Sequence, residues 1–96
     1  MASSDHGVYA ISVAASMVSM EIQNLRVYER RGLLTPDRTT GGTRLYSGDD
    51  VERLERIRDL LADGLNLAGV ARVLELEDEV ADLRSQLEGA QQEQSA

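Results

Sequence analysis

The sequence predicts a mainly α-helical fold with a small β-hairpin in its middle and a long helix at its C-terminal end. Apolar residues recur at helical spacing on both sides of the central segment. Within that segment, "PDRTTGGTRLY" (residues 36–46) joins two short runs of strand-forming residues through a Gly-Gly turn. From residue 73 to residue 90 the apolar spacing alternates between three and four positions, which is the heptad pattern of a coiled-coil helix.

The composition limits the classes of protein to which the chain can belong. Its 96 residues carry a formal charge of −7, its ten basic residues are all arginine, and it has no cysteine, which excludes a disulfide framework and a thiolate metal site. No apolar run is long enough to span a membrane, and the N-terminus lacks the pattern of a signal peptide. No phosphate-binding loop is present, and the single histidine, His6, lies near the N-terminus. We expect a cytoplasmic, nucleoid-associated binding protein, with no enzymatic activity, cofactor or metal.

The N-terminal region should contain a tail and a first short helix. Residues 1–8 are small and polar, so we expect a disordered tail, and residues 8–11 ("VYAI") should form an extended entry. Ser12 is the expected N-cap of a helix over residues 13–18. The face of this helix that packs inward is predicted to consist of Val13, Ala14 and Met17.

A second helix should follow after a tight turn. Ser19 lies in that turn, where it could also cap the next helix, and the helical spacing of Ile22 and Leu25 predicts a helix over residues 20–31. Gly32 is the expected C-terminal stop, because glycine readily adopts the left-handed conformation. Two short helices joined in this way form a helix-turn-helix candidate.

The hairpin and a third helix complete the expected first domain. Pro36 prevents continuation of a helix, and "TTGGT" (residues 39–43) is a tight reversal. Residues 47–50 read as a capping box. They should open a helix that ends at Gly64 and whose buried stripe consists of Val51, Leu54, Ile57 and Leu61. A helix-turn-helix followed by a hairpin is a winged helix, so residues 9–65 are predicted to form a winged helix-turn-helix DNA-binding domain.

The last helix is predicted to mediate dimerisation. Asn66 is its expected N-cap, and residues 66–90 form the expected coiled-coil segment, followed by a disordered tail over residues 91–96. The heptad seam consists of Val73, Leu76, Val80, Leu83 and Leu87, and continues to Ala90. The alternative is an amphipathic helix that packs within its own chain. We favour a homodimer, because the preceding residues offer little surface to cover so long a seam.

The net charge conceals a local excess of arginine. Between Arg26 and Tyr46 there are five arginines against two acids, whereas residues 60–96 alone carry a charge of −6. Three of the arginines lie on the second helix and two on the arms of the hairpin, namely Arg26, Arg30 and Arg31, and Arg38 and Arg44. Guanidinium groups placed in this way suit DNA phosphates and guanine edges. The alternative is a solvated surface on which the arginines form salt bridges with Glu29 and Asp37.

Two further side chains at the start of the second helix could read bases. Gln23 and Asn24 should face the major groove, where amide side chains pair with adenine. Glu21 could accept a hydrogen bond from cytosine, but we favour a role in complementing the helix dipole.

The motifs "LRVYERRGLLTP" and "GGTRLYS" resemble those of the MerR family of bacterial transcription regulators, and the flanking segments resemble its heat-shock repressor (HspR) branch. The resemblance implies DNA contacts by Arg26 and Tyr28 on the second helix and by Arg44 and Tyr46 on the wing. Tyr28 and Tyr46 could instead be packing residues. Ser19, Asn24 and Val27 differ from the usual residues of the family, so we expect a shifted operator and do not assume heat-shock genes as targets.

The leading hypothesis is a homodimeric transcription regulator, more specifically a repressor, that binds double-stranded DNA at an inverted-repeat operator. Its second helix would enter the major groove and its wing would lie on phosphates. The resemblance also allows a chaperone or another protein as co-regulator. Two alternatives remain, a MerR-like protein-binding modulator of a chaperone or cochaperone, and a small excisionase-like recombination factor.

Overall fold

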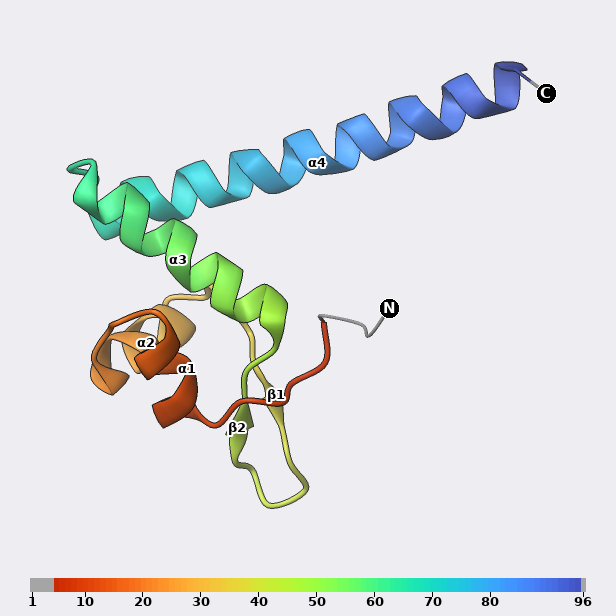
Figure 1. The fold of residues 1–96 in the computed structure, drawn as a ribbon. Coiled ribbons are helices and arrows are strands. Elements are labelled where there is room, and N and C mark those ends of the chain that lie inside the picture. The colour runs from red at the N-terminus through yellow and green to blue at the C-terminus, as the bar shows by residue number, and fades with distance from the viewer. Residues whose placement is uncertain (1–4, 96) are drawn as a thin grey trace. The chain divides into compact units, whose positions relative to one another are not determined.

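The computed structural model describes residues 5–95, with side chains described for residues 5–93. Residues 1–4 and 96, which belong to the two predicted disordered tails, lie outside the described residues. The chain forms two compact units, one ending at Gly64 and the other beginning at Leu65. The elements in chain order are α1 (Ile11–Met17), α2 (Ile22–Arg30), β1 (Asp37–Arg38), β2 (Arg44–Leu45), α3 (Gly48–Ala62) and α4 (Leu67–Ser95) (Figure 1). Among the described residues, no helix is both long and apolar enough to cross a bilayer.

Helix α1 begins earlier than the sequence indicated. Its N-cap is Ala10, which makes no side-chain hydrogen bond, and Ser12 lies inside the helix, so the predicted Ser12 cap is wrong. The buried residues are Ala14 and Ala15, followed by Val18 just after the helix. Val13 and Met17, expected to face inward, are each about half exposed. The two alanines lack bulk, and they allow α2 to pack closely against α1.

The turn between α1 and α2 has an unusual backbone. Ser19 has a φ of 56°, in the left-handed region that residues with a Cβ rarely adopt. Helix α2 begins at Ile22 with Glu21 as its N-cap, so Ser19 lies in the turn as predicted but does not cap the helix. Leu25 and Tyr28 are the buried residues of α2. Gly32, with a φ of 76°, follows the end of the helix and confirms the predicted stop.

The hairpin is antiparallel, with Asp37 paired to Leu45 and Arg38 paired to Arg44. Its reversal is closed by hydrogen bonds from the Thr39 N–H to the Thr43 carbonyl at 2.8 Å and from the Gly42 N–H to the Thr39 carbonyl at 2.9 Å. Gly42 has a φ of 86°, the conformation that a three-residue loop requires at its last position. The predicted Gly-Gly reversal is therefore confirmed.

The segment before α1 adds a third extended element beside the hairpin (Figure 1). The Tyr46 N–H donates to the Tyr9 carbonyl at 2.7 Å, and the Val8 and Tyr9 N–H groups both donate to the Tyr46 carbonyl at 2.9 Å. The Gly7 N–H donates to Oδ2 of Asp37 at 2.9 Å. A Cβ at Gly7 would lie 2.5 Å from the Leu45 carbonyl oxygen. Gly7 and Val8, expected in the disordered tail, are thus held against the wing, because glycine allows the two backbones to approach closely.

Helix α3 opens with the predicted capping box. The Ser47 hydroxyl accepts from the Asp50 N–H at 3.0 Å, and the Asp50 carboxylate accepts from the Ser47 N–H at 2.9 Å. The buried stripe of α3 consists of Val51, Leu54, Ile57 and Leu60. Leu60 occupies the last position of the stripe in place of the expected Leu61, which is half-buried.

Two arginines of α3 connect it to the remainder of its unit. Nε of Arg53 donates to the Leu33 carbonyl at 2.8 Å, and NH1 of Arg58 donates to the Val18 carbonyl at 2.8 Å. These carbonyls lie in the two irregular segments that flank α2, so α3 contacts the chain on both sides of that helix.

Tyr46 is the largest fully buried side chain of the described chain, and Tyr28 is nearly as buried. The Tyr46 hydroxyl is buried without a hydrogen-bond partner among the described residues. Burial raises the pKa of both phenols above the usual 10.0, and the Glu29 carboxylate raises the pKa of Tyr46 further. Burial therefore favours the neutral form of both phenols.

Helix α4 is continuous from Leu67 to Ser95. Its first turn is capped by Asn66, whose Oδ1 accepts from the Gly69 N–H at 2.8 Å, as the sequence predicted. The start of the fourth helix and the heptad seam therefore form one continuous helix. The helix also extends beyond Glu88 into the predicted disordered tail over residues 91–96, as far as Ser95. Val70 and Leu74 are buried, whereas Leu76, Val80, Leu83 and Leu87 are exposed.

We expect Ser47→Ala to lower the free energy of unfolding by about 1 kcal/mol, because it removes the side-chain acceptor of a capping box. Ser12→Ala is the matched control. Ser12 lies inside α1, where alanine has the higher helix propensity, so this variant should keep or slightly raise stability. Urea unfolding of both variants measures the difference. A larger loss for Ser12→Ala than for Ser47→Ala would show that the helix starts are assigned incorrectly.

We expect Tyr46→Phe to leave stability at neutral pH within about 0.5 kcal/mol of the wild type, because no hydrogen bond is lost with the hydroxyl. Its effect should appear in alkali. The pKa of Tyr46 is higher in the folded state than the unfolded-state value of 10.0. The neutral phenol therefore contributes its full stabilisation below the unfolded-state pKa, and this contribution is lost as the pH rises through the folded-state pKa. Urea midpoints measured from pH ~8 to pH ~11 should therefore fall less steeply for Tyr46→Phe than for the wild type. Equal slopes would contradict burial of the phenol.

Candidate nucleic-acid interface

One side of α2 packs inward and the other presents polar and basic groups. Leu25 and Tyr28 are buried, and they lie one turn apart on the same face. The exposed residues of α2 and its C-cap include five of the predicted DNA contacts, namely Gln23, Asn24, Arg26, Arg30 and Arg31. The helix therefore has the two-sided character of a recognition helix, with its inner face fixed by the core and its outer face available to a ligand.

The arginines of α2 are not neutralised within their own unit. Among the residues that the structure describes, no carboxylate lies within salt-bridge distance of Arg26, Arg30 or Arg31. The predicted alternative, a solvated surface of paired arginines, therefore does not hold for this helix. Unpaired exposed guanidinium groups on one short helix are a favourable site for a polyanion.

The wing arginines are arranged differently, because both contact Glu29 of α2. NH2 of Arg38 lies 3.0 Å from Oε1 of Glu29, and Nε of Arg44 lies 2.6 Å from Oε2. The side chain of Glu29 is only 16% exposed, which lowers the screening of these contacts by solvent. One carboxylate thus joins both arms of the hairpin to α2. For the two wing arginines, the alternative interpretation therefore correctly predicted Glu29 as the salt-bridge partner.

Asp37, the second acid of that alternative, makes a different contact. Its carboxylate accepts from the Gly7 backbone and so anchors the N-terminal segment to the wing. The carboxylate of Asp37 therefore holds the backbone of the N-terminal segment in place.

The two wing arginines use different nitrogens. Arg38 donates through NH2 to Glu29 and through NH1 to the Gly42 carbonyl at 3.1 Å, so both of its terminal nitrogens are engaged within the protein. Arg44 donates to Glu29 through Nε, and its terminal nitrogens have no partner among the described residues. The two residues were predicted to have the same role, but their donors are not equally available.

Tyr28 and Tyr46 do not lie on this surface. Tyr28 is 5% exposed and Tyr46 is fully buried. The sequence left two roles open for each ring, and the structure places both in the core. Their burial supports the packing role for both tyrosines, and a DNA contact by either ring stays a prediction.

Sequence reasoning missed the central position of Glu29. The sequence suggests Glu29 only as one partner on a solvated surface, whereas the residue connects three elements at low exposure. Its signal in the sequence is an acid within a run of arginines on α2, opposite an arginine on each arm of the hairpin. That signal specifies opposite charges, but it does not specify which nitrogens meet the carboxylate.

The fold and this surface can be compared with known proteins. Residues 9–77 match the MerR HTH family of regulatory proteins. A Streptomyces coelicolor protein provisionally named heat shock protein HspR is 49% identical over 82 residues, which make up 84% of this chain and 54% of that protein. The chain spans about half the length of the curated relatives that it matches.

Solved structures share the architecture. A MerR-family transcriptional regulator from Bacillus cereus superposes with a TM-score of 0.66 at 30% identity, covering 91% of this chain and 69% of its own. HiNmlR, a MerR-family regulator lacking the sensor domain and solved bound to promoter DNA, gives a TM-score of 0.67 at 23% identity, covering 86% of this chain and 70% of its own. This second likeness shows the fold alone. The predicted winged helix-turn-helix fold is confirmed, and the chain belongs to the MerR HTH family of regulatory proteins, with an HspR-like relative.

Proposed function

We propose that the protein is a homodimeric, sequence-specific DNA-binding transcription regulator that acts as a repressor. The observation that carries this proposal is the exposed face of α2, where Arg26, Arg30 and Arg31 have no acidic partner among the described residues. Gln23 and Asn24 lie exposed at the start of the same helix, where a recognition helix meets base edges. A regulator of the same fold, HiNmlR, was solved bound to promoter DNA, so the fold is compatible with DNA binding.

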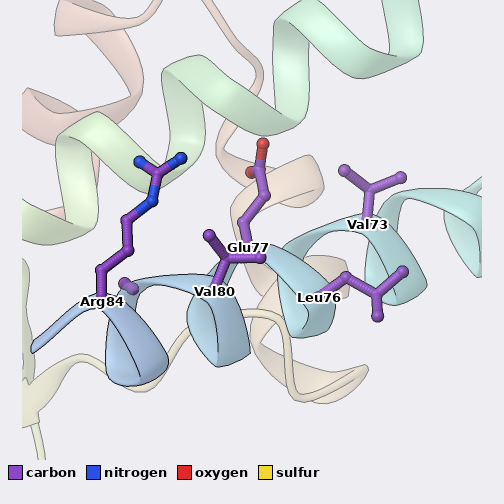
Figure 2. A pocket seen from close by; sticks show the side chains of 6 residues that line it. Val73, Leu76, Glu77, Val80 and Arg84 are labelled. Carbon is purple, nitrogen blue, oxygen red and sulfur yellow. The ribbon is translucent and has the colours of Figure 1, made fainter. Parts of the chain in front are cut away.

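The proposed dimer interface is the exposed seam of α4. Leu83 and Leu87 are each about 60% exposed, which is unusual for leucines at regular helical spacing in a stable monomer. The seam opens into a shallow apolar hollow of about 400 Å³ on α4 (Figure 2). The residues that line it are Val73, Leu76, Glu77, Val80, Ala81 and Arg84. A second copy of α4 fits this surface, because its own seam supplies the apolar side chains.

The charges beside the seam indicate how two copies would align. Figure 2 shows Glu77 and Arg84 extending to the same side of α4. In an antiparallel pair with Val80 opposite Leu83 of the partner subunit, Glu77 lies beside the partner's Arg84, and by symmetry the contact occurs twice. A shift of one heptad in one direction places Glu77 beside Glu77 of the partner subunit, and a shift in the other direction places Arg84 beside the partner's Arg84. Both shifts bring like charges together. We therefore propose the antiparallel register that pairs Leu76 with the partner's Leu87.

A two-fold dimer of this kind would present two copies of α2, so the operator should be an inverted repeat. Repression would then follow from occlusion or distortion of a promoter. The HspR relative is named as a heat shock protein, which supports a chaperone as the class of co-regulator. The alternatives of a cochaperone-binding module and an excisionase-like factor are decided by the DNA experiment that follows.

Selection of bound duplexes from sheared genomic DNA should enrich an inverted repeat whose affinity falls steeply as salt rises. Arg26→Ala should weaken binding to that duplex by roughly ten-fold or more, the loss expected for one guanidinium contact to a base or phosphate. Arg44→Ala should also weaken binding. Arg56→Ala removes the same charge from the exposed side of α3 and is the control, for which we expect a much smaller change.

The proposal is wrong if no duplex is enriched and binding stays weak at low salt. Recovery of a stoichiometric protein partner after nuclease treatment would then favour the cochaperone-binding module. Enrichment of direct repeats by a protein that is monomeric in solution would favour the excisionase-like factor.

The register of the dimer can be tested by cysteine cross-linking, because the chain has no cysteine of its own. When the Leu76→Cys and Leu87→Cys proteins are mixed and oxidised, we expect a disulfide-linked heterodimer on a non-reducing gel. Leu87→Cys alone should stay uncross-linked, because the two copies of residue 87 lie far apart in an antiparallel pair. Efficient cross-linking of Leu87→Cys alone would show a parallel coil, and a monomer by sedimentation would exclude the dimer.

A further inference from the structure

We propose that Glu29 is a positioning residue for phosphate binding, whose carboxylate holds Arg44 through Nε and so directs the terminal nitrogens of Arg44 towards a DNA phosphate. The same carboxylate also holds Arg38, which stabilises the loop of the wing. This inference rests on the proposed DNA-binding function, and it assigns different tasks to two arginines that the sequence treats alike.

The hydrogen bonds distinguish the two arginines. Nε of Arg44 donates to Oε2 of Glu29 at 2.6 Å, which fixes the guanidinium plane and leaves NH1 and NH2 without a protein partner among the described residues. Arg38 uses NH2 for Oε1 of Glu29 and NH1 for the Gly42 carbonyl. Bidentate binding of phosphate requires two parallel N–H groups from one edge of the guanidinium. Both terminal nitrogens of Arg44 are free for this contact, whereas each terminal nitrogen of Arg38 already donates one of its N–H bonds to the protein.

Exposure alone would suggest the opposite assignment, because the side chain of Arg38 is 49% exposed and that of Arg44 is 32% exposed. Exposed area, however, does not measure which donors are free. The Arg38 contact with Gly42 spans the reversal of the hairpin, so Arg38 braces the loop itself. Arg44 lies on the opposite arm, where it pairs with Arg38 across the strands. The shared carboxylate offsets the repulsion between these two cations.

Simple electrostatics and the positioning role predict opposite effects of removing the Glu29 charge. An acid on a DNA-binding surface repels phosphate, so its neutralisation should tighten binding and steepen the salt dependence. If Glu29 orients Arg44, its neutralisation releases that guanidinium, and a rigid contact is replaced by a mobile one. Binding should then weaken although the domain gains one unit of positive charge. The sign of the change therefore decides between the two roles.

The experiment compares Glu29→Gln with Glu21→Gln on the duplex that the wild-type protein selects. We expect Glu29→Gln to weaken binding by roughly ten-fold, the size of one charge-assisted hydrogen bond. The slope of log affinity against log salt should become shallower by about one phosphate contact. Glu21, the exposed N-cap of α2, makes no side-chain capping bond, and its neutralisation should leave binding unchanged or tighten it.

A double-mutant cycle then tests the link to Arg44. Arg44→Ala should weaken binding and reduce the salt slope in the wild-type background, but should have little further effect once Glu29→Gln is present. Arg38→Ala should leave the salt slope unchanged. Arg44→Lys keeps the charge, but its single ammonium nitrogen cannot both contact Glu29 and present two separate nitrogens to a phosphate, so it should bind like Arg44→Ala. Circular dichroism and thermal melting show that each variant is folded at the assay temperature.

Three results would each overturn the inference. They are tighter binding by Glu29→Gln, a loss of salt slope in Arg38→Ala equal to that in Arg44→Ala, and wild-type binding by Arg44→Lys. Arg44→Lys keeps the test valid if Glu29→Gln does not fold. Failure of the wild-type protein to bind any duplex overturns the proposed function as well, so the two failures are distinguishable.

Discussion

The first unit of the structure depends on one junction in the chain, at Tyr46 and Ser47. The Tyr46 backbone pairs with Tyr9, which fixes the entry to α1, and its ring fills the centre of the core. The next residue, Ser47, caps α3 through its hydroxyl and donates its own N–H to the Asp50 carboxylate. The N-terminal segment, the hairpin and α3 are therefore fixed relative to one another by two consecutive residues. Because strand pairing, burial and capping are satisfied together, a shift of register at this point would break all three.

The junction also helps to hold the wing in place although the hairpin is small. A two-residue strand pair has few hydrogen bonds and is marginal by itself. The wing is held by Tyr9 on one side and by Glu29 on the other, so it has more contacts than its own strands supply. A wing supported in this way can present a guanidinium in a fixed direction. The net charge of the whole chain has little bearing on this surface, because most of the acidic excess lies in α4.

Local patterns in the sequence predicted the elements whose causes are local. The Ser47 capping box, the Gly32 stop, the Gly-Gly reversal and the Asn66 cap all depend on residues within a few positions of one another, and each is observed. The position of α1 was predicted less well, because its start is fixed by pairing with Tyr46, far along the chain. The same limit applies to the site. Opposite charges on α2 and the wing were visible, but the contact of Glu29 with both arginines depends on tertiary placement. The burial of Tyr28 and Tyr46 likewise required the fold.

The left-handed backbone of Ser19 bears on how the turn of the helix-turn-helix can vary. A residue with a Cβ in this conformation carries strain of about 1 kcal/mol, which glycine would relieve. Glycine would also give the unfolded chain more conformational freedom, at a cost of similar size. The two effects nearly cancel, so serine and glycine should be almost interchangeable at this position during evolution. Such a turn can drift between the two residues without a compensating change elsewhere, provided that the residue lies outside the contacts that bind a ligand.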